Sequence, residues 1–182
     1  MRWLLRASLA VNAALGLALA RRLRHRAMLK AGVINAPEQD FAAVARETFA
    51  PAEAGSVAFV GDSHVALGPW LEVLTPYRNR GISGAKIADV STWIDSVLAD
   101  RPGRLVLMIG SNDVYFGVPR AQSMAAARQL FDRIAEQAGC PVTVVSLPPI
   151  KVERRSAKTM NTALRKLADE RGFGWLDIHS TL

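Results

Sequence analysis

The sequence predicts an α/β domain whose parallel sheet is covered by helices on both faces, and two observations carry this prediction. Short apolar runs of strand length alternate with longer helical patterns from Ser56 onward. The runs are almost continuously apolar, and strand–helix alternation of this kind is typical of buried parallel sheets. With 182 residues, 50% of them hydrophobic, the chain is long enough for one such domain and a short appendage.

The predicted elements follow one another in a regular order. Strands are expected at residues 57–60, in the region of Tyr77, and at 105–110, 142–146 and 173–178. Helices are expected between them, over residues 64–74, 88–99, 119–137 and 156–171. In such sheets ligands bind beyond the carboxyl ends of the strands, so functional residues are expected at that edge.

The net charge of +7 is concentrated in the N-terminal segment. Residues 1–30 hold seven Arg and Lys residues and no acidic residue. Removing these seven from the 23 basic residues leaves 16, which balance the 16 Asp and Glu residues, all at Glu38 or beyond. A nucleic-acid-binding protein carries its basic surface on the folded domain, so no nucleic-acid partner is expected.

Residues 1–30 are interpreted as a membrane-anchor or signal-like helix with a basic flank. Residues 3–20 are apolar apart from Arg6 and Asn12, and RRLRHR follows them. The uncharged stretch 7–20 would form a helix of about 21 Å, shorter than the roughly 30 Å hydrocarbon core unless Arg6 extends to the interface. We therefore expect membrane association through this single segment, with an interfacial helix or a cleaved signal peptide as alternatives. The basic flank favours a cytoplasmic domain over an exported one.

Two further regions complete the organisation of the chain. Residues 31–55 mix Pro, Gly and Ala with a short helical pattern and are interpreted as a linker to a domain over residues 56–182. Cys140 is the single cysteine, so it cannot contribute to an intrachain disulfide or a cysteine cluster. It is interpreted as a small buried hydrophobic residue.

A serine follows the first predicted strand. The segment Gly61-Asp62-Ser63-His64 places Ser63 in a strand-to-helix turn, close to the amides that begin the helix. This position suits a nucleophile, because the same amides can stabilise an oxyanion. The alternative is that Asp62 or Ser63 only caps the helix.

Two other polar segments follow the next two strands. The glycines of Asn79-Arg80-Gly81-Ile82-Ser83-Gly84 allow a backbone N–H to approach a substrate closely. In Gly110-Ser111-Asn112-Asp113 the side-chain amide of Asn112 can donate to a developing oxyanion, and one such donor is worth about 3 kcal/mol. The alternatives are a glycine-rich loop without a ligand and an ordinary turn.

In order and placement, these segments resemble the motif blocks of the SGNH hydrolase family, the GDSL-like esterases and lipases. GDSH resembles the nucleophile block, NRGISG the glycine block and GSND the GxND block. LPPI at residues 147–150 and the helix 160–172, which leads into GWLDIHSTL, are similar to further family features. The resemblance covers residues 56–182. It implies a flavodoxin-like, three-layer α/β/α fold with a parallel five-stranded sheet in the order 2-1-3-4-5, preceded here by the N-terminal apolar helix.

The resemblance also implies a serine ester hydrolase that works through an acyl-enzyme. Ser63 would be the nucleophile, and the N–H groups of Ser63 and Gly84 with the side chain of Asn112 would form the oxyanion hole. No metal or organic cofactor is implied. The substrate would be a small ester or acylated molecule, and lipid esters, acylated sugars and thioesters all suit the family. A non-catalytic binding domain on the same fold is the alternative.

The chain departs from the family at the catalytic base. The family's base is a histidine in a DxxH motif, and this sequence contains no such spacing. Its histidines are His25 in the basic flank, His64 beside the serine, and His179 at the end of the last strand. In the implied strand order, His179 would lie roughly 14 Å from the nucleophile strand at ~4.8 Å per strand, too far for a base. We therefore expect the domain to be C-terminally incomplete and nearly inactive by itself.

Overall fold

The computed structural model describes residues 23–24, 39–50, 54–68, 76–150 and 154–181. The chain divides into two compact units, Met1–Asn35 and Ala36–Leu182, and the description below concerns the second unit. The membrane-anchor helix expected over residues 1–30 lies outside the described residues except for Leu23 and Arg24. None of the helices in the described part of the chain is both long and apolar enough to cross a bilayer.

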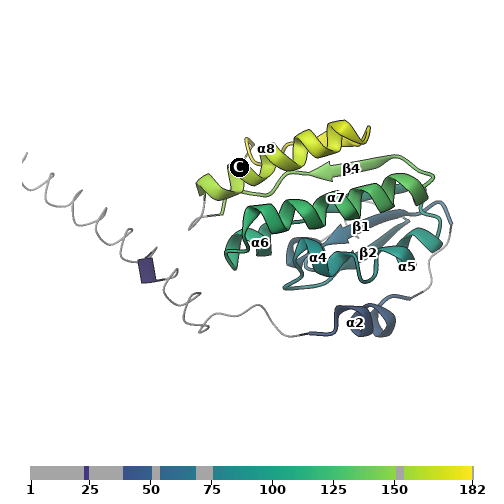
Figure 1. Cartoon of the computed structure of the whole chain (residues 1–182). Helices are drawn as coiled ribbons and strands as arrows, with labels where there is room; N and C mark the ends of the chain where they lie inside the picture. Colours follow the sequence, from purple (N-terminus) through teal and green to yellow (C-terminus); the bar gives the residue numbers. More distant parts are fainter. Residues whose placement is uncertain (1–22, 25–38, 51–53, 69–75, 151–153, 182) are drawn as a thin grey trace, which may run out of the picture. The chain divides into compact units, whose positions relative to one another are not determined.

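The second unit is built on one parallel sheet (Figure 1). Its strand order, β2-β1-β3-β4-β5, is the order expected from the sequence. The strands are β1 (Val57–Gly61), β2 (Tyr77–Gly81), β3 (Arg104–Met108), β4 (Val142–Val145) and β5 (Gly174–Leu176). Strand β1 lies between β2 and β3, with Gly61 opposite Gly81 on one side and Met108 on the other. The carboxyl ends of these three strands therefore meet at one edge of the sheet.

Helices flank the sheet, as expected. Those in the described residues are α2 (Phe41–Thr48), α3 (Ser63–Ala66), α4 (Ile87–Val90), α5 (Ile94–Ala99), α6 (Ser111–Tyr115), α7 (Arg120–Gln137) and α8 (Arg154–Glu170). The long helices α7 and α8 pack against each other, and α7 also contacts α4 and α5 (Figure 1). Buried residues of α7 recur every three or four positions, so one stripe of this helix faces the sheet: Met124, Ala127, Leu130, Phe131 and Ile134.

The core has a large part and a small part. The large cluster joins the inward stripes of α7 and α8 to strand residues such as Val60 and Leu107, both of which are fully buried. The small cluster consists of Phe59, Val65, Met108 and Val145. Because side chains alternate along a strand, Phe59 and Val60 point to opposite faces, so α3 places Val65 on the face opposite α7.

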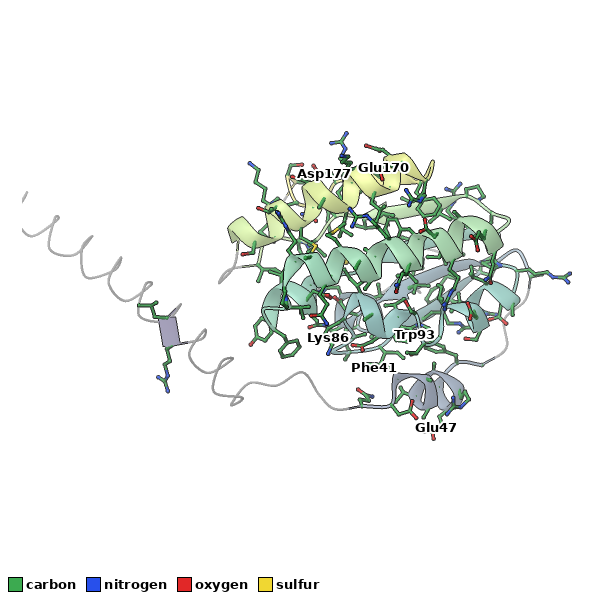
Figure 2. The ribbon with its side chains drawn as sticks, viewed as in Figure 1. Phe41, Glu47, Lys86, Trp93, Glu170 and Asp177 are labelled. Atoms are coloured by element: carbon green, nitrogen blue, oxygen red, sulfur yellow. The ribbon has the colours of Figure 1, made fainter. Side chains whose placement is uncertain are left out.

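Part of the segment expected to be a linker belongs to the compact unit. Helix α2 begins after Asp40, whose carboxylate accepts a hydrogen bond from the N–H of Ala43 at 3.0 Å. Phe41 and Ala45 are buried, and the ring of Phe41 stacks on Trp93 with 6.0 Å between centroids. Figure 2 shows Phe41 and Trp93 facing each other from α2 and the main body. The folded unit therefore begins before Ser56.

The helix expected over residues 88–99 is two short helices. Helix α4 ends at Val90 and α5 begins at Ile94, with Trp93 at the start of α5 and 2% exposed. The break lets Trp93 turn into the core against Phe41, a contact that no local pattern in the sequence reveals. Burial of a large aromatic side chain outweighs the continuity of one helix here.

The last residues of β2 include a buried arginine. The guanidinium of Arg80, with its side chain 6% exposed, donates to the carboxylate of Asp100 at 3.0 Å and to the carbonyl of Ala50 at 2.8 Å. It also lies over the ring of Phe49, 5.0 Å from the centroid. These partners make the burial of the charge tolerable, and they attach the end of α2 to the sheet.

Candidate active site

Three segments come together at the carboxyl edge of the sheet. Ser63 follows the end of β1 by two residues, Gly84 follows β2 by three, and Asn112 follows β3 by four. These strands are neighbours, in the order β2-β1-β3. The structure thus places the three residues singled out in the sequence on adjacent strand ends, with Ser63 on the central strand.

Ser63 is the first residue of α3. The carboxylate of Asp62 caps this helix by accepting a hydrogen bond from the N–H of His64 at 2.9 Å. Ser63 itself is half-buried, and its hydroxyl bonds to none of the described residues. The hydroxyl is therefore not used to cap the helix, since Asp62 performs that function.

Close packing with β2 fixes the position of α3. Asn79 donates from its side-chain amide to the carbonyls of Val65 and Ala66, at 3.0 and 3.1 Å, and accepts from the N–H of Gly81 at 3.0 Å. A Cβ on Gly81 would overlap the backbone nitrogen of Ala66. The first and third residues of the segment NRGISG thus hold the helix that carries Ser63 against the sheet.

His64 is oriented by the same carboxylate that caps the helix. Its Nδ1 lies 2.8 Å from the Oδ1 of Asp62, which is 1% exposed, while the imidazole is 43% exposed. The hydrogen bond to Asp62 raises the pKa of His64 above its ordinary value, and partial burial opposes this effect. The second carboxylate oxygen of Asp62 is buried and has no partner among the described residues.

The loop after β2 is a tight turn that ends in a left-handed glycine. The N–H of Ile82 donates to the carbonyl of Gly61 at 3.0 Å, and the N–H of Ala85 donates back to Ile82 at 3.2 Å. Gly84 has a φ of 86°, a backbone conformation that residues with a Cβ adopt only with steric strain. The glycine at this position is therefore a conformational requirement of the turn.

Helix α6 attaches to this loop through two neighbouring side chains. The amide of Asn112 donates to the carbonyl of Ala85 at 2.9 Å, and the carboxylate of Asp113 accepts from the N–H of Ile87 at 2.9 Å. Helix α6 begins after Gly110, whose φ is 106°, so the chain reverses sharply at the end of β3. The sequence singled out Asn112 but assigned no function to Asp113, although both belong to the GSND segment.

His179 lies elsewhere on the sheet. Its Nδ1 is 3.0 Å from the carbonyl of Leu147, beyond the end of β4, and its N–H donates to the hydroxyl of Ser146 and to Asp177, both at 2.9 Å. Strands β3 and β4 separate β5 from β1. The structure therefore brings Ser63, Gly84 and Asn112 to one edge and attaches His179 to the β4–β5 side.

The described residues contain no group of three or more His, Cys, Asp or Glu side chains that could hold a metal ion. Cys140, expected to be a small buried residue, is partly buried and packs against the large core cluster. Burial raises the pKa of its thiol above the ordinary value, so a smaller fraction of the thiol is ionised at neutral pH.

Known proteins with this architecture include several esterases. The acetylxylan esterase Axe2 from Geobacillus stearothermophilus is 19% identical, with a TM-score of 0.59 over 71% of this chain and 78% of that one. A second structure, described as a lipolytic protein of the G-D-S-L family from Desulfitobacterium hafniense DCB-2, is 21% identical. Its TM-score is 0.61 over 67% of this chain and 76% of that one. AlinE4, an esterase of the SGNH-hydrolase family, is 16% identical, with a TM-score of 0.56 over 69% and 77%. No curated protein sequence matches the chain.

A serine at a strand-to-helix turn, beside a glycine turn and an asparagine on the neighbouring strand ends of a 2-1-3-4-5 parallel sheet, is the arrangement typical of the SGNH hydrolase fold. The sequence comparison agrees with this class. Residues 52–182 match the GDSL-like lipase/acylhydrolase family, and the chain belongs to that family.

Proposed function

We propose that this protein is a serine ester hydrolase in which Ser63 is the nucleophile. The observation that carries the proposal is the arrangement at the sheet edge. A half-buried serine hydroxyl, free of hydrogen bonds to the described residues, lies on the strand end between a glycine turn and a side-chain amide. Family membership supports the reaction class, because the matched family comprises lipases and acylhydrolases.

In the proposed reaction the Oγ of Ser63 attacks the ester carbonyl carbon. A bond forms between Oγ and that carbon, the carbonyl oxygen becomes an oxyanion, and the serine proton passes to a base. The alkoxide then leaves as the C–O bond breaks and takes up a proton, giving the acyl-enzyme and an alcohol. Water attacks the acyl-enzyme in the same way, which releases the acid and restores Ser63.

The oxyanion would be stabilised by the N–H groups of Ser63 and Gly84 and by the amide of Asn112. An asparagine amide carries two protons, and Asn112 donates one of them to the carbonyl of Ala85. This bond fixes the orientation of the amide, and the second proton stays available for the substrate. Donors held in place in this way stabilise the transition state without reorganising during the reaction.

The proposal includes weak activity for the residues that the structure describes. Of the histidines in the described residues, His64 is bonded to Asp62 and His179 to the Leu147 carbonyl. Neither forms a hydrogen bond to the Ser63 hydroxyl in that part of the chain. Loss of a triad member leaves only the residual catalysis of the oxyanion hole and substrate binding. The same observation favours the second candidate, a binding domain that retains the fold without turnover.

Labelling with a fluorophosphonate tests the proposal on the full-length gene product. Reaction forms a bond from Ser63 Oγ to phosphorus with loss of fluoride, and mass spectrometry locates the adduct. We expect an adduct on Ser63 that Ser63→Ala abolishes and Ser96→Ala, a change of an exposed serine on α5, preserves. Hydrolysis of p-nitrophenyl acetate in the same variants measures turnover. A full-length protein that is folded but carries no adduct on Ser63 would favour the binding domain.

We further propose that the N-terminal segment attaches the protein to a membrane. The support is the largely apolar stretch 3–20 and the segment RRLRHR that follows it, which contains four arginines and a histidine. Anionic lipid attracts such a flank, and an apolar helix adds burial in the bilayer. Flotation with vesicles of phosphatidylcholine and phosphatidylserine tests this point. We expect the full chain to float and a chain without residues 1–30 to remain in the dense fraction; equal behaviour of the two would contradict the proposal.

A further inference from the structure

Asp113 is a buried carboxylate that the proposed reaction does not use. Asp113 belongs to α6 and is 2% exposed. One oxygen accepts the N–H of Ile87, the first residue of α4, at 2.9 Å. Burial raises the pKa of the Asp113 carboxyl above its ordinary value, and the hydrogen bond from the Ile87 N–H opposes this effect. A charged group in this position is costly unless it is hydrogen-bonded, and the Ile87 N–H supplies such a bond.

The partner lies in the segment that carries Gly84. Gly84 is followed by Ala85, whose carbonyl accepts the amide of Asn112, and two residues later by Ile87, whose N–H donates to Asp113. Two consecutive side chains of α6 thus hold the segment 85–87. Asn112 donates to its Ala85 carbonyl, and Asp113 accepts from its Ile87 N–H. The turn before it is closed by the bond from Ala85 N–H to Ile82, which joins it to β2.

The two hydrogen bonds link the parts of the chain that carry two donors of the proposed oxyanion hole, the Gly84 N–H and the Asn112 amide. The amide of Asn112 and the N–H of Gly84 come from different strand ends, so their separation is not set by either segment alone. Asp113 is adjacent to Asn112 in the chain, and its bond to Ile87 resists movement of the loop away from α6. A buried hydrogen bond to a carboxylate is stronger than one between neutral groups, which suits a contact that must hold its geometry.

We propose that Asp113 is a positioning residue that fixes the Gly84 N–H relative to the Asn112 amide. The inference rests on the proposed function, in which these two groups stabilise the oxyanion. Asp113 does not touch the substrate. It acts by holding the start of α4, and hence the turn before it, against α6.

The test compares Asp113→Ala with Asp113→Asn in the full-length gene product. Alanine removes the acceptor of the Ile87 N–H, whereas asparagine retains a carbonyl oxygen that can accept it. Asp95→Asn, on the exposed surface of α5, is the matched control for loss of a carboxylate. The readouts are the rate of fluorophosphonate labelling at Ser63, kcat and KM for p-nitrophenyl acetate, and hydrogen exchange of the peptide covering residues 82–90.

We expect Asp113→Ala to lower the labelling rate and kcat by about 10- to 100-fold, since a displacement near 1 Å can cost 10²-fold. KM should change little, because the lost interaction belongs to the transition state. Exchange of residues 82–90 should become faster, and Asp113→Asn should recover most of the rate and the protection. If Asp113→Ala does not fold, Asp113→Ser replaces it, because serine is too short to reach the Ile87 N–H.

Three outcomes would overturn the inference. They are wild-type labelling in the alanine or serine variant, unchanged exchange in residues 82–90, or an asparagine variant as slow as the alanine variant. Failure of the proposed function gives a different result, in which the folded wild type carries no adduct on Ser63. In that case the exchange measurement alone decides whether Asp113 holds the loop.

Discussion

Replacement of Gly81 by alanine tests the packing that holds α3 in place. A Cβ at position 81 would overlap the backbone nitrogen of Ala66 and lie 2.8 Å from the Cβ and Cγ1 of Val65. These atoms belong to the helix that begins with Ser63 and to a buried side chain of the small core cluster. The added methyl group cannot be accommodated by the rotation of a flexible side chain, so α3 must move.

The expected cost follows from the cost of overpacking. Insertion of a methyl group into a well-packed site destabilises by about 1–3 kcal/mol. For a domain of this size, each kcal/mol shifts the melting temperature by about 2–4 °C, so a cost near 2 kcal/mol corresponds to roughly 4–8 °C. Displacement of α3 should also slow the labelling of Ser63, because the hydroxyl moves with the helix.

Gly174→Ala is the matched control, since Gly174 also lies in a parallel strand. A Cβ there would meet the Oγ1 of Thr143 at 3.5 Å and the carbonyl of Val142 at 3.6 Å, both ordinary contacts. Because alanine restricts the unfolded chain more than glycine does, this variant should be neutral or more stable by up to about 1 kcal/mol. Thermal unfolding followed by circular dichroism compares the two variants. A Gly81→Ala protein that melts at or above the temperature of Gly174→Ala would refute the packing argument.

Three further predictions concern the contacts around the site. Arg80→Met should lower the free energy of unfolding by about 2–3 kcal/mol in urea titrations. This is below the roughly 3–5 kcal/mol of a fully buried pair, because the side chain of Asp100 is 27% exposed. The control Arg133→Met removes an exposed pair with Asp95 and should cost under about 1 kcal/mol, so equal losses in the two variants would contradict the prediction. Asn79→Ala should cost about 1–3 kcal/mol, because it removes the side chain that accepts from the Gly81 N–H and donates to two helix carbonyls, and a melting temperature equal to that of the wild type would argue against it. The pKa of His64 is raised in the folded state, so its bond to Asp62 adds stability below the unfolded pKa near 6.5, and this contribution is lost as pH rises through the folded value. Melting temperatures of wild type and His64→Gln should therefore differ more at pH 5 than at pH 8, and a constant difference would exclude the linkage.

Local pattern determined the strands and the segments that follow them. Apolar runs of four to six residues indicated β1, β3 and β4, because buried parallel strands need apolar side chains on both faces. The short polar segments after these runs marked the site, since the carboxyl ends of parallel strands share an edge. Strand β2, with the sequence YRNRG, has almost no apolar residues, and only the glycine motif NRGISG, whose first three residues lie inside β2, indicated its position.

The sequence alone therefore determined the class of fold, the strand ends that carry Ser63, Gly84 and Asn112, and the family to which the chain belongs. Tertiary structure decided which hydrogen bonds hold the segments that carry those groups. The carboxylate of Asp113 binds the Ile87 N–H, the amide of Asn79 binds a carbonyl of α3, and the carboxylate of Asp62 binds the ring of His64. It also decided that the expected helix over residues 88–99 breaks at Trp93, and that Phe41 of the expected linker joins the core. The physical reason is the range of the interactions. Strand and turn preferences act over a few neighbouring residues, whereas a hydrogen bond between α6 and α4, or a stack of Phe41 on Trp93, joins segments that only the folded chain brings together.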